Sequence, residues 1–359
     1  MSSTLDTLPV PIVQAPMAGG PSTSRLAAAV CEAGGFGFVA AGYRTPDGMR
    51  EDIRALRDLT ARPFGVNLFM PSPDRADEES IERYARALGD QARRAGASLG
   101  TARFDDDAFQ EKLEILLSDP VPVVSFTFGC PSSEVVQALI DAGTEVWVTV
   151  TTPEEAAQAE SAGASALVVQ GSEAGGHRGS FSDRFDLPDY SILALLQLIG
   201  AQAGLPLVAA GGIATGRGVA AVVSAGAAAA QIGPALMRSR EAATSRIHRE
   251  APASSRPTGT TRVFTGRLAR GIVNRLMREK ESDAIIAYPE VHFLTAPLRA
   301  HGREVGDADV INLWAGQTHQ LAQERPAGEI VRSLHAEAIE AVHRARERLS
   351  AVESADGRR

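Results

Sequence analysis

Cysteine is almost missing from this sequence of 359 residues, which contains only Cys31 and Cys130. Two cysteines cannot build a disulfide framework, and neither of them belongs to a C-x-x-C pair of the kind that holds zinc. The sequence therefore excludes disulfide-stabilised scaffolds and the common zinc modules. A reducing compartment suits this composition, and we expect a cytoplasmic protein.

An excess of positive charge is also lacking, since 36 basic residues stand against 44 acidic ones and the net charge is -8. Such a balance argues against a surface that binds nucleic acid. No segment approaches the roughly 18 consecutive apolar residues that a membrane-spanning helix needs. The first residues, MSSTLDTLPV, have neither the basic nor the apolar region of a secretory signal. We expect no nucleic-acid partner and no membrane span.

Short apolar runs are abundant, and 44% of the residues are hydrophobic. Strands of a parallel sheet are buried on both faces, so they occur as short continuous apolar runs. Eight such runs cover residues 11–15, 36–40, 64–68, 121–126, 145–150, 166–169, 205–209 and 229–232.

Segments with a helical pattern lie between most of these runs, at residues 23–33, 133–142, 153–162, 192–203 and 216–225. Several of them end in Ala-Gly, where glycine suits the left-handed position that closes a helix. Strand and helix alternate about eight times, which predicts an α/β fold of the (β/α)8 TIM barrel type. An open, doubly wound sheet is the alternative.

Two stretches interrupt this repeat. Residues 70–118 contain a charged helical pattern at 78–94, and residues 235–325 contain helical patterns at 239–250 and 266–279. We predict a barrel formed by residues 1–234 and 326–350, with a closing helix at 328–349. We further predict a mainly helical lid at 235–325 and a disordered tail at 351–359.

Chemistry is expected where the barrel strands end, because the loops at their C-terminal ends build the active site in this fold. The first strand leads into APMAGG, which has little side-chain polarity and would let a flat ligand approach the backbone. The third strand contains Asn67. The sixth is followed by QGSEAGGHRG, which contains Gln170 and His177 among four glycines.

The seventh and eighth strands lead into AAGGIATGRG and QIGP. These are the two places where barrels most often hold a phosphate, with free backbone N–H groups and a helix N-terminus. The dinucleotide fingerprint G-x-G-x-x-G after a first strand is missing. A phosphate here, with a planar ring over the first, third and sixth strands, would describe flavin mononucleotide (FMN).

Five motifs, QAPMAGG, VSFTFGCP, VVQGSEAGGHRG, AAGGIATGRG and WAGQ, occur in an order that resembles the nitronate monooxygenase family, formerly called 2-nitropropane dioxygenases. The resemblance extends from about residue 9 to residue 317. It implies an FMN-binding (β/α)8 barrel. It also implies an oxidoreductase that oxidises alkyl nitronates, with nitroalkanes as a further substrate, using O2 and releasing carbonyl compounds and nitrite.

The resemblance also implies roles for individual residues. The backbone around Ala15 and Met17 would lie against the flavin, Asn67 and Gln170 would bond to it, and His177 would be catalytic. The phosphate cradle would consist of Gly175, Gly176, Gly211, Gly212, Gln231 and Gly233. The chain departs from the family at Pro234, where a Thr or Ser is usual, because proline has neither a hydroxyl nor an N–H. That contact would be lost or taken over by Thr215 or Gly216.

Histidine suits the removal of a proton from a nitroalkane, because its ordinary pKa lies near neutrality. A nitronate needs no base, and His177 would then position the anion. The other histidines lack metal-ligand spacing, so we expect no metal and place them on the surface or in the lid. We interpret Cys130 as a small buried residue, Glu173 as a loop hydrogen-bond acceptor, and Arg267 and Arg270 as part of a solvated helix face.

Three alternatives stay open from the sequence. The first is an FMN barrel that takes hydride from NAD(P)H, either a quinone reductase or an enoyl-acyl carrier protein reductase. The second is a non-catalytic flavin-binding protein, and the third is a barrel for another phosphorylated ligand. The sequence does not indicate an oligomeric state.

Overall fold

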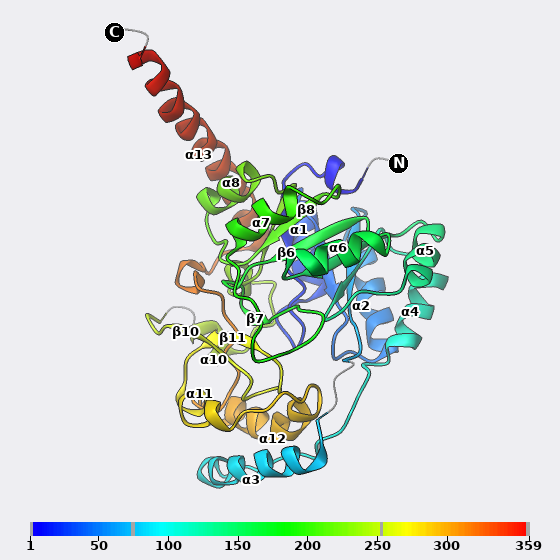
Figure 1. The fold of residues 1–359 in the computed structure, drawn as a ribbon, viewed down its shortest axis with the longest axis vertical. Coiled ribbons are helices and arrows are strands. Elements are labelled where there is room, and N and C mark those ends of the chain that lie inside the picture. Colours follow the sequence, from blue (N-terminus) through cyan, green and yellow to red (C-terminus); the bar gives the residue numbers. More distant parts are fainter. Residues whose placement is uncertain (1–2, 73–75, 252–253, 357–359) are drawn as a thin grey trace.

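The computed structural model describes residues 3–72, 76–251 and 254–356, and side chains as far as residue 350. Eight parallel strands form its main sheet (Figure 1), in the spatial order β1-β9-β8-β6-β5-β4-β3-β2. Their bounds are β1 Ile12–Gln14, β2 Gly37–Ala40, β3 Phe64–Phe69, β4 Val123–Thr127, β5 Glu145–Val150, β6 Ala166–Gln170, β8 Leu207–Ala210 and β9 Ala229–Ile232. All eight coincide with the predicted apolar runs to within two residues at each end.

The ring closes between the first and last strands of this order. The N–H of Gln14 donates to the carbonyl of Phe36 over 2.8 Å, and the N–H of Phe36 donates to the carbonyl of Ile12 over 2.9 Å. A parallel bridge pairs Val13 with Phe36. The TIM-barrel prediction is therefore confirmed, and the alternative of an open doubly wound sheet is wrong.

Helices surround the barrel: α1 Ser24–Glu32, α2 Pro46–Leu59, α4 Phe109–Ser118, α5 Ser133–Asp141, α6 Pro153–Ser161, α7 Ile192–Gly200 and α8 Gly216–Ser224. Most of them begin at a Ser or Thr whose side chain accepts the N–H three residues later, as Thr23 does from Leu26. This N-cap bond satisfies one of the free donors at a helix start. Sequence thus defines both ends of these helices, through the cap residue and the terminal Ala-Gly.

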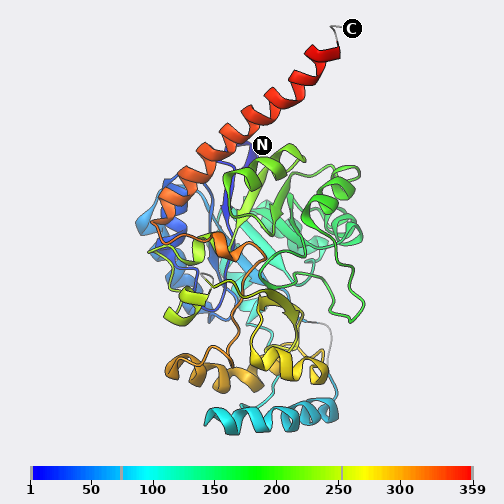
Figure 2. The ribbon, with the colours of Figure 1, turned by 90° about the vertical axis from the view of Figure 1, so that its left-hand side faces the viewer.

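The last helix, α13 (Ala327–Asp356), packs on α8 and α1 and then projects beyond the barrel (Figure 2). It includes the predicted closing helix. The helix covers the first residues of the predicted tail 351–359, whereas residues 357–359 lie outside the described residues, so the tail stays a prediction.

The interior of the barrel is filled at one level by three aromatic rings. The centroids of Phe36, Phe38 and Trp147 lie 5.3 to 5.8 Å apart, and all three side chains are buried. Valines from β1, β4, β6 and β8 pack around them. Because this layer closes the barrel, ligand-sized space is left only above it, at the C-terminal strand ends.

The inserted segment, residues 235–325, contains two strands as well as helices. Its elements, with the one that leads into it, are α9 Pro234–Met237, α10 Arg246–Glu250, β10 Thr258–Thr261, β11 Ala269–Ile272, α11 Arg275–Lys280 and α12 Glu290–Val305. Single 3-10 turns cover Leu5–Thr7, Glu281–Asp283 and His319–Leu321. Strand β11 pairs antiparallel with β10 and with β7 (Gly176–His177), which comes from the loop after β6.

Two helix predictions in this segment are wrong. Residues 266–279 form α11 only at their end, because the backbone of β11 is used in pairing and Gly266 adopts a φ of 75° that interrupts a helix. Residues 239–250 form only α10. The guanidinium of Arg249 accounts for this, since it donates to the carbonyls of Arg238, Ser239 and Ala242 over 2.7 to 2.9 Å and holds them in a loop.

Helix α3 (Glu78–Ala95), which was predicted at 78–94, packs against α12 at the end of the molecule opposite the projecting α13 (Figures 1 and 2). Tyr84 and Leu88 of α3 join Leu294, Leu298 and Ile311 in a second hydrophobic cluster, separate from the barrel core. The two interruptions of the repeat thus share one core. The proposed domain boundary at residue 234 stays a prediction, and this packing would assign α3 to the smaller part.

Candidate functional site

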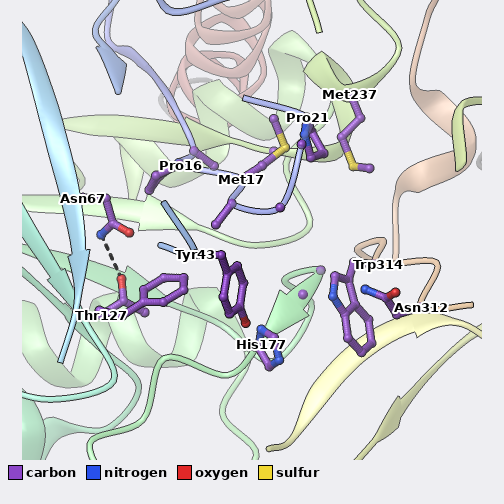
Figure 3. Close-up of a pocket in the computed structure, with 18 of the residues that line it drawn as sticks. Pro16, Met17, Pro21, Tyr43, Asn67, Thr127, His177, Met237, Asn312 and Trp314 are labelled. Atoms are coloured by element: carbon purple, nitrogen blue, oxygen red, sulfur yellow. Dashed lines mark hydrogen bonds between the residues drawn. The ribbon is translucent and has the colours of Figure 1, made fainter. Parts of the chain in front are cut away.

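A cavity of about 560 Å³ lies where the C-terminal strand ends of the barrel meet the inserted segment (Figure 3). Nine of the eleven predicted site residues line it. These are Ala15, Met17, Asn67, Gln170, Gly175, Gly176, His177, Gln231 and Gly233. They follow five different strands, so the barrel brings together residues that are far apart in the sequence.

Gly211 and Gly212 are not among the lining residues. Both have positive φ angles, 122° and 66°, and both lie under the loop after β6. A Cβ on Gly211 would stand 3.1 Å from the backbone nitrogen of Ala174, and one on Gly212 would stand 3.1 Å from the Cβ of Glu173. In this structure the two glycines admit that loop, and their contact with a phosphate stays a prediction.

Gln170, the last residue of β6, holds the backbone around His177. Its Nε2 donates to the carbonyl of His177 over 3.1 Å, and its Oε1 accepts the N–H of Gly179 over 2.8 Å. Glu173 accepts the N–H of Ile192 over 3.1 Å, as expected for a loop acceptor. The loop is therefore pinned at both ends.

Asn67 is almost fully buried at the end of β3. Its Nδ2 donates to the carbonyl and hydroxyl of Ser125 and to the hydroxyl of Thr127, over 2.9 to 3.2 Å (Figure 3). Within the described part of the chain, these bonds leave its Oδ1 as an acceptor beside the cavity. Such an acceptor suits an N–H on the edge of a planar ring.

His177 lies on β7, with its backbone paired to Ala269 of β11. Its Nε2 is 2.9 Å from the hydroxyl of Thr265. Burial lowers the pKa of His177 to about 3, and the positive charges of Arg267 and Arg299 lower it further in the same direction. The imidazole is therefore neutral at any ordinary pH while no anion is close to it.

Aromatic rings surround this imidazole. The centroids of Trp314, Phe128 and Tyr288 lie 5.4 to 5.7 Å from that of His177. Tyr43 stands beside it in the cavity, stacked on His292 with centroids 4.5 Å apart, and bonds through its hydroxyl to Tyr288 (Figure 3). Apart from WAGQ, sequence reasoning missed these rings, and nothing in their spacing signals a site.

Two arginines of α12 also line the cavity and were missed. Arg299 is 5% exposed, and its side chain donates to the carbonyl of His292 over 2.7 Å and to Asn312 Oδ1 over 3.4 Å. Arg303 donates to the same Oδ1 over 2.7 Å. Among the described residues neither guanidinium has a carboxylate partner, and no Asp or Glu lines the cavity.

The predicted solvated face for Arg267 and Arg270 is wrong. Arg267 is 1% exposed, lies with its guanidinium carbon 4.2 Å above the ring centre of Phe128, and donates to the carbonyl of Ser180. Arg270 belongs to β11 and donates to the carbonyl of Ser172 over 2.8 Å. Both are bound to the loop after β6 because the segment forms a strand there and not a helix.

The surroundings of Pro234 bear on the predicted phosphate contacts. Pro234 lines the cavity at the start of α9. The hydroxyl of Thr215 caps α8 by accepting the N–H of Gly218, and the N–H of Gly216 donates to Glu337 of α13 over 3.2 Å. Both proposed replacements thus already have partners within the protein.

The residues present fit a flavin on three counts. Asn67 offers an acceptor at the cavity wall, and Gly176, with φ 77°, has no atom within 4 Å of where a Cβ would stand. The absence of lining carboxylates among the described residues leaves nothing to repel a phosphate.

Other features are more ordinary. His248 bonds to the carbonyl of Trp314 over 2.8 Å and lines the cavity with His292, and both belong to the inserted segment. Burial raises the pKa of Cys130 to about 11, which suits an unreactive thiol. Within the described ranges, no cluster of His, Cys, Asp or Glu could hold a metal ion, and no helix is long and apolar enough to cross a bilayer.

The chain is similar to proteins of one family along most of its length. The profile of the family described as Nitronate monooxygenase matches residues 2–337. A probable nitronate monooxygenase from Staphylococcus aureus (strain Newman) is 37% identical over 331 residues, which cover 90% of this chain and 93% of that relative.

Solved structures agree with this similarity. A nitroalkane oxidase from Streptomyces ansochromogenes is 49% identical with a TM-score of 0.92, over 95% of this chain and 99% of the other. FabK from Thermotoga maritima is 27% identical with a TM-score of 0.75, over 95% and 97%. The enoyl reductase domain of MlnA from Bacillus amyloliquefaciens, at 13% identity and a TM-score of 0.65, shares the fold alone.

Proposed function

This chain belongs to the nitronate monooxygenase family, and on that basis we propose that it is an FMN-dependent enzyme that oxidises alkyl nitronates with O2. The membership confirms the family indicated by the motifs and makes the chain an oxidoreductase. Proteins of this family are flavoproteins in general, and they act on small molecules. That the flavin is FMN, and which nitro compounds react, are parts of the proposal.

The observation that carries the proposal is the pairing of a neutral barrel face with a cationic cover. Arg299 and Arg303 face the cavity without a carboxylate among the described residues, and a buried cation without a counter-ion is costly. A substrate that is itself an anion, such as a nitronate, would offset that cost. These arginines therefore favour a nitronate bound beside His177.

In the proposed arrangement Ala15, Met17, Asn67 and Gln170 hold the flavin ring, while the phosphate lies at Gly175, Gly176, Gly211, Gly212, Gln231 and Gly233. Bound FMN would supply electron transfer between the substrate and O2. In the overall reaction the carbon–nitrogen bond breaks, the carbon gains an oxygen atom derived from O2, and nitrogen leaves as nitrite. The aromatic rings around His177 exclude water from that carbon.

The lowered pKa of His177 bears on which form of the substrate is used. A nitronate needs no base, so a neutral imidazole suffices for it. With a neutral nitroalkane, proton transfer creates an imidazolium–nitronate pair. At a separation of about 4 Å and an effective dielectric of about 20, that pair is worth about 4 kcal/mol, or about three pKa units. This offsets most of the shift to about 3, so nitroalkanes remain usable but react more slowly.

Two measurements on the purified protein test the proposal. The visible spectrum should contain a flavin band, and O2 uptake with an alkyl nitronate should be matched by nitrite release. The same preparation should be assayed for NADH oxidation with a quinone and with an enoyl thioester. NADH turnover without nitrite release would replace the nitronate assignment with the reductase alternative, and a colourless protein would remove the flavin.

Replacing His177 with Asn gives the first specific prediction. His177→Asn should lower kcat/KM for a neutral nitroalkane by about 100-fold or more, because the proton acceptor is lost. Activity on the preformed nitronate should fall by no more than about tenfold. Equal losses on both forms would show that His177 does not act as a base.

A further inference from the structure

We propose that Thr265 is a positioning residue that keeps the proton of His177 on Nε2 and leaves Nδ1 as the proton acceptor, an inference that rests on the function proposed above. This hydroxyl contact decides whether the imidazole can take a proton from a carbon atom or can only donate one to an anion. Thr265 thereby sets the substrate range of the site, with neutral nitro compounds in addition to nitronates.

Backbone contacts fix the position of Thr265. Its side chain is 1% exposed and lies in a turn closed by the N–H of Gly266, which donates to the carbonyl of Arg262 over 2.8 Å. Gly266 has a φ of 75°, and a Cβ there would collide with the carbonyl of Ala287. The N–H of Ala287 in turn donates to the carbonyl of Gly266 over 3.0 Å. The hydroxyl therefore has little freedom to move away from His177.

The hydrogen bonds of this hydroxyl define its direction. Oγ1 of Thr265 lies 2.9 Å from Nε2 of His177 and 3.3 Å from the carbonyl oxygen of Arg267. A hydroxyl has one proton to donate, and a carbonyl oxygen can only accept. With that proton directed to Arg267, the oxygen accepts from His177, so Nε2 must bear the hydrogen.

The ring has only one proton to place. Burial and the charges of Arg267 and Arg299 disfavour the imidazolium, so the neutral form predominates. The ring also cannot turn away with its backbone, because Gln170 binds the His177 carbonyl and β7 pairs with β11. A proton on Nε2 consequently leaves a lone pair on Nδ1.

The two tautomers would do different chemistry. With Nδ1 free, the proton on the carbon of a neutral nitro compound moves to Nδ1, and the C–H electron pair forms the carbon–nitrogen double bond of the nitronate. The Nε2–H bond to Thr265 persists in the resulting imidazolium. With the proton on Nδ1, the ring could donate to a nitronate oxygen but could not accept from carbon.

Thr265→Val, with Thr265→Ser as the matched control, tests the proposal in the flavin-loaded protein. Valine keeps the shape and removes the hydroxyl, whereas serine keeps the hydroxyl. Long-range ¹H–¹⁵N spectra of protein labelled at histidine report which ring nitrogen bears the proton, and the signals that vanish in His177→Asn assign the residue. The wild type and Thr265→Ser should show protonation at Nε2, and Thr265→Val should show a mixture or protonation at Nδ1.

A kinetic measurement complements the spectra. The ratio of kcat on nitroethane to kcat on ethyl nitronate should fall about 10- to 100-fold in Thr265→Val and stay within about twofold in Thr265→Ser. A thermal melt and the flavin band check that each variant is folded and loaded. A wild-type proton on Nδ1, or an unchanged ratio in Thr265→Val, would refute the role of Thr265. Nε2 protonation without nitrite from either substrate would uphold the tautomer and refute the proposed function.

Discussion

The two sides of the cavity differ in chemistry. The barrel side presents amides and glycines, with Asn67, Gln170 and Gln231 as its polar side chains near the strand ends. The inserted segment presents Arg299 and Arg303, together with histidines and Trp314. A neutral face suits a flat cofactor, whereas a cationic cover selects a small anion. His177 lies between them, on a short strand that links the barrel loop to the inserted segment.

The two regions also differ in how they are held together. The barrel core is continuous around eight strands, while the second cluster consists of a few residues drawn from α3, α11, α12 and the loops between them. A smaller core stabilises less, because stability follows the apolar area removed from water. We therefore expect the inserted segment to open at lower denaturant than the barrel.

The largest predicted effect breaks the second cluster alone. Leu276 of α11 is fully buried there, so Leu276→Ala should cost about 3 kcal/mol of unfolding free energy. The chain has two tryptophans, Trp147 in the barrel and Trp314 in the inserted segment, and single-tryptophan variants made with Trp147→Phe or Trp314→Phe report each region separately. In urea, the Trp314 transition should move to lower concentration than the Trp147 transition.

The control for this experiment is Leu196→Ala, a buried leucine of α7 in the barrel cluster. It should shift the Trp147 transition. Coincident Trp147 and Trp314 transitions in Leu276→Ala would mean that the two regions form one cooperative unit, and the proposed division into domains would be wrong.

The next prediction concerns the charge on the cover. Arg303→Gln should raise KM for an alkyl nitronate about tenfold, roughly 1.4 kcal/mol, because it removes one of two cations from the cavity while leaving Asn312 in place. Bound flavin and kcat should stay nearly unchanged. Steady-state kinetics with a parallel flavin titration measure both quantities.

Two variants sharpen this result. Arg246→Gln removes an exposed arginine of the same segment, with 91% of its side chain accessible, and should leave KM unchanged. Asn67→Ala should do the reverse of Arg303→Gln, weakening flavin binding with little effect on KM. A rise in KM shared by Arg246→Gln would attribute the effect to overall charge.

The smallest prediction is a dependence of stability on pH. Burial lowers the pKa of His248 to about 4, whereas the unfolded chain has the ordinary value near 6.5. The unfolded state therefore binds the proton first, so this contribution is present above pH 6.5 and is lost as pH falls toward 4. Between pH 7.5 and 5.5 it should amount to about 1 kcal/mol.

Urea titrations of Trp314 fluorescence at the two pH values measure this loss. His248→Asn should reduce the pH dependence by that amount, while His343→Asn, at an exposed position of α13, should not change it. The remaining dependence is expected from His177 and His292, whose pKa values burial lowers in the same direction. An identical pH slope in His248→Asn and the wild type would contradict the prediction.

The barrel could be predicted because each of its strands is buried on both faces and is followed by a helix with a Ser or Thr cap. The residues at the strand ends could be placed for the same reason, and Asn67, Gln170 and His177 do meet at one cavity. The inserted segment could not, because pairing with β7 and β10 overrides the helical propensity of residues 266–279. Arg267 was misplaced along with it.

Sequence alone determined the ring of strands, the family and the histidine among glycines, because periodicity and local turn chemistry act over a few residues at a time. Tertiary structure alone decided that Thr265, Arg299 and Trp314 face that histidine. Their positions depend on a segment that begins almost sixty residues after His177 and folds back across the barrel mouth. Contacts of such sequence separation leave no local pattern, because packing of the whole chain sets them.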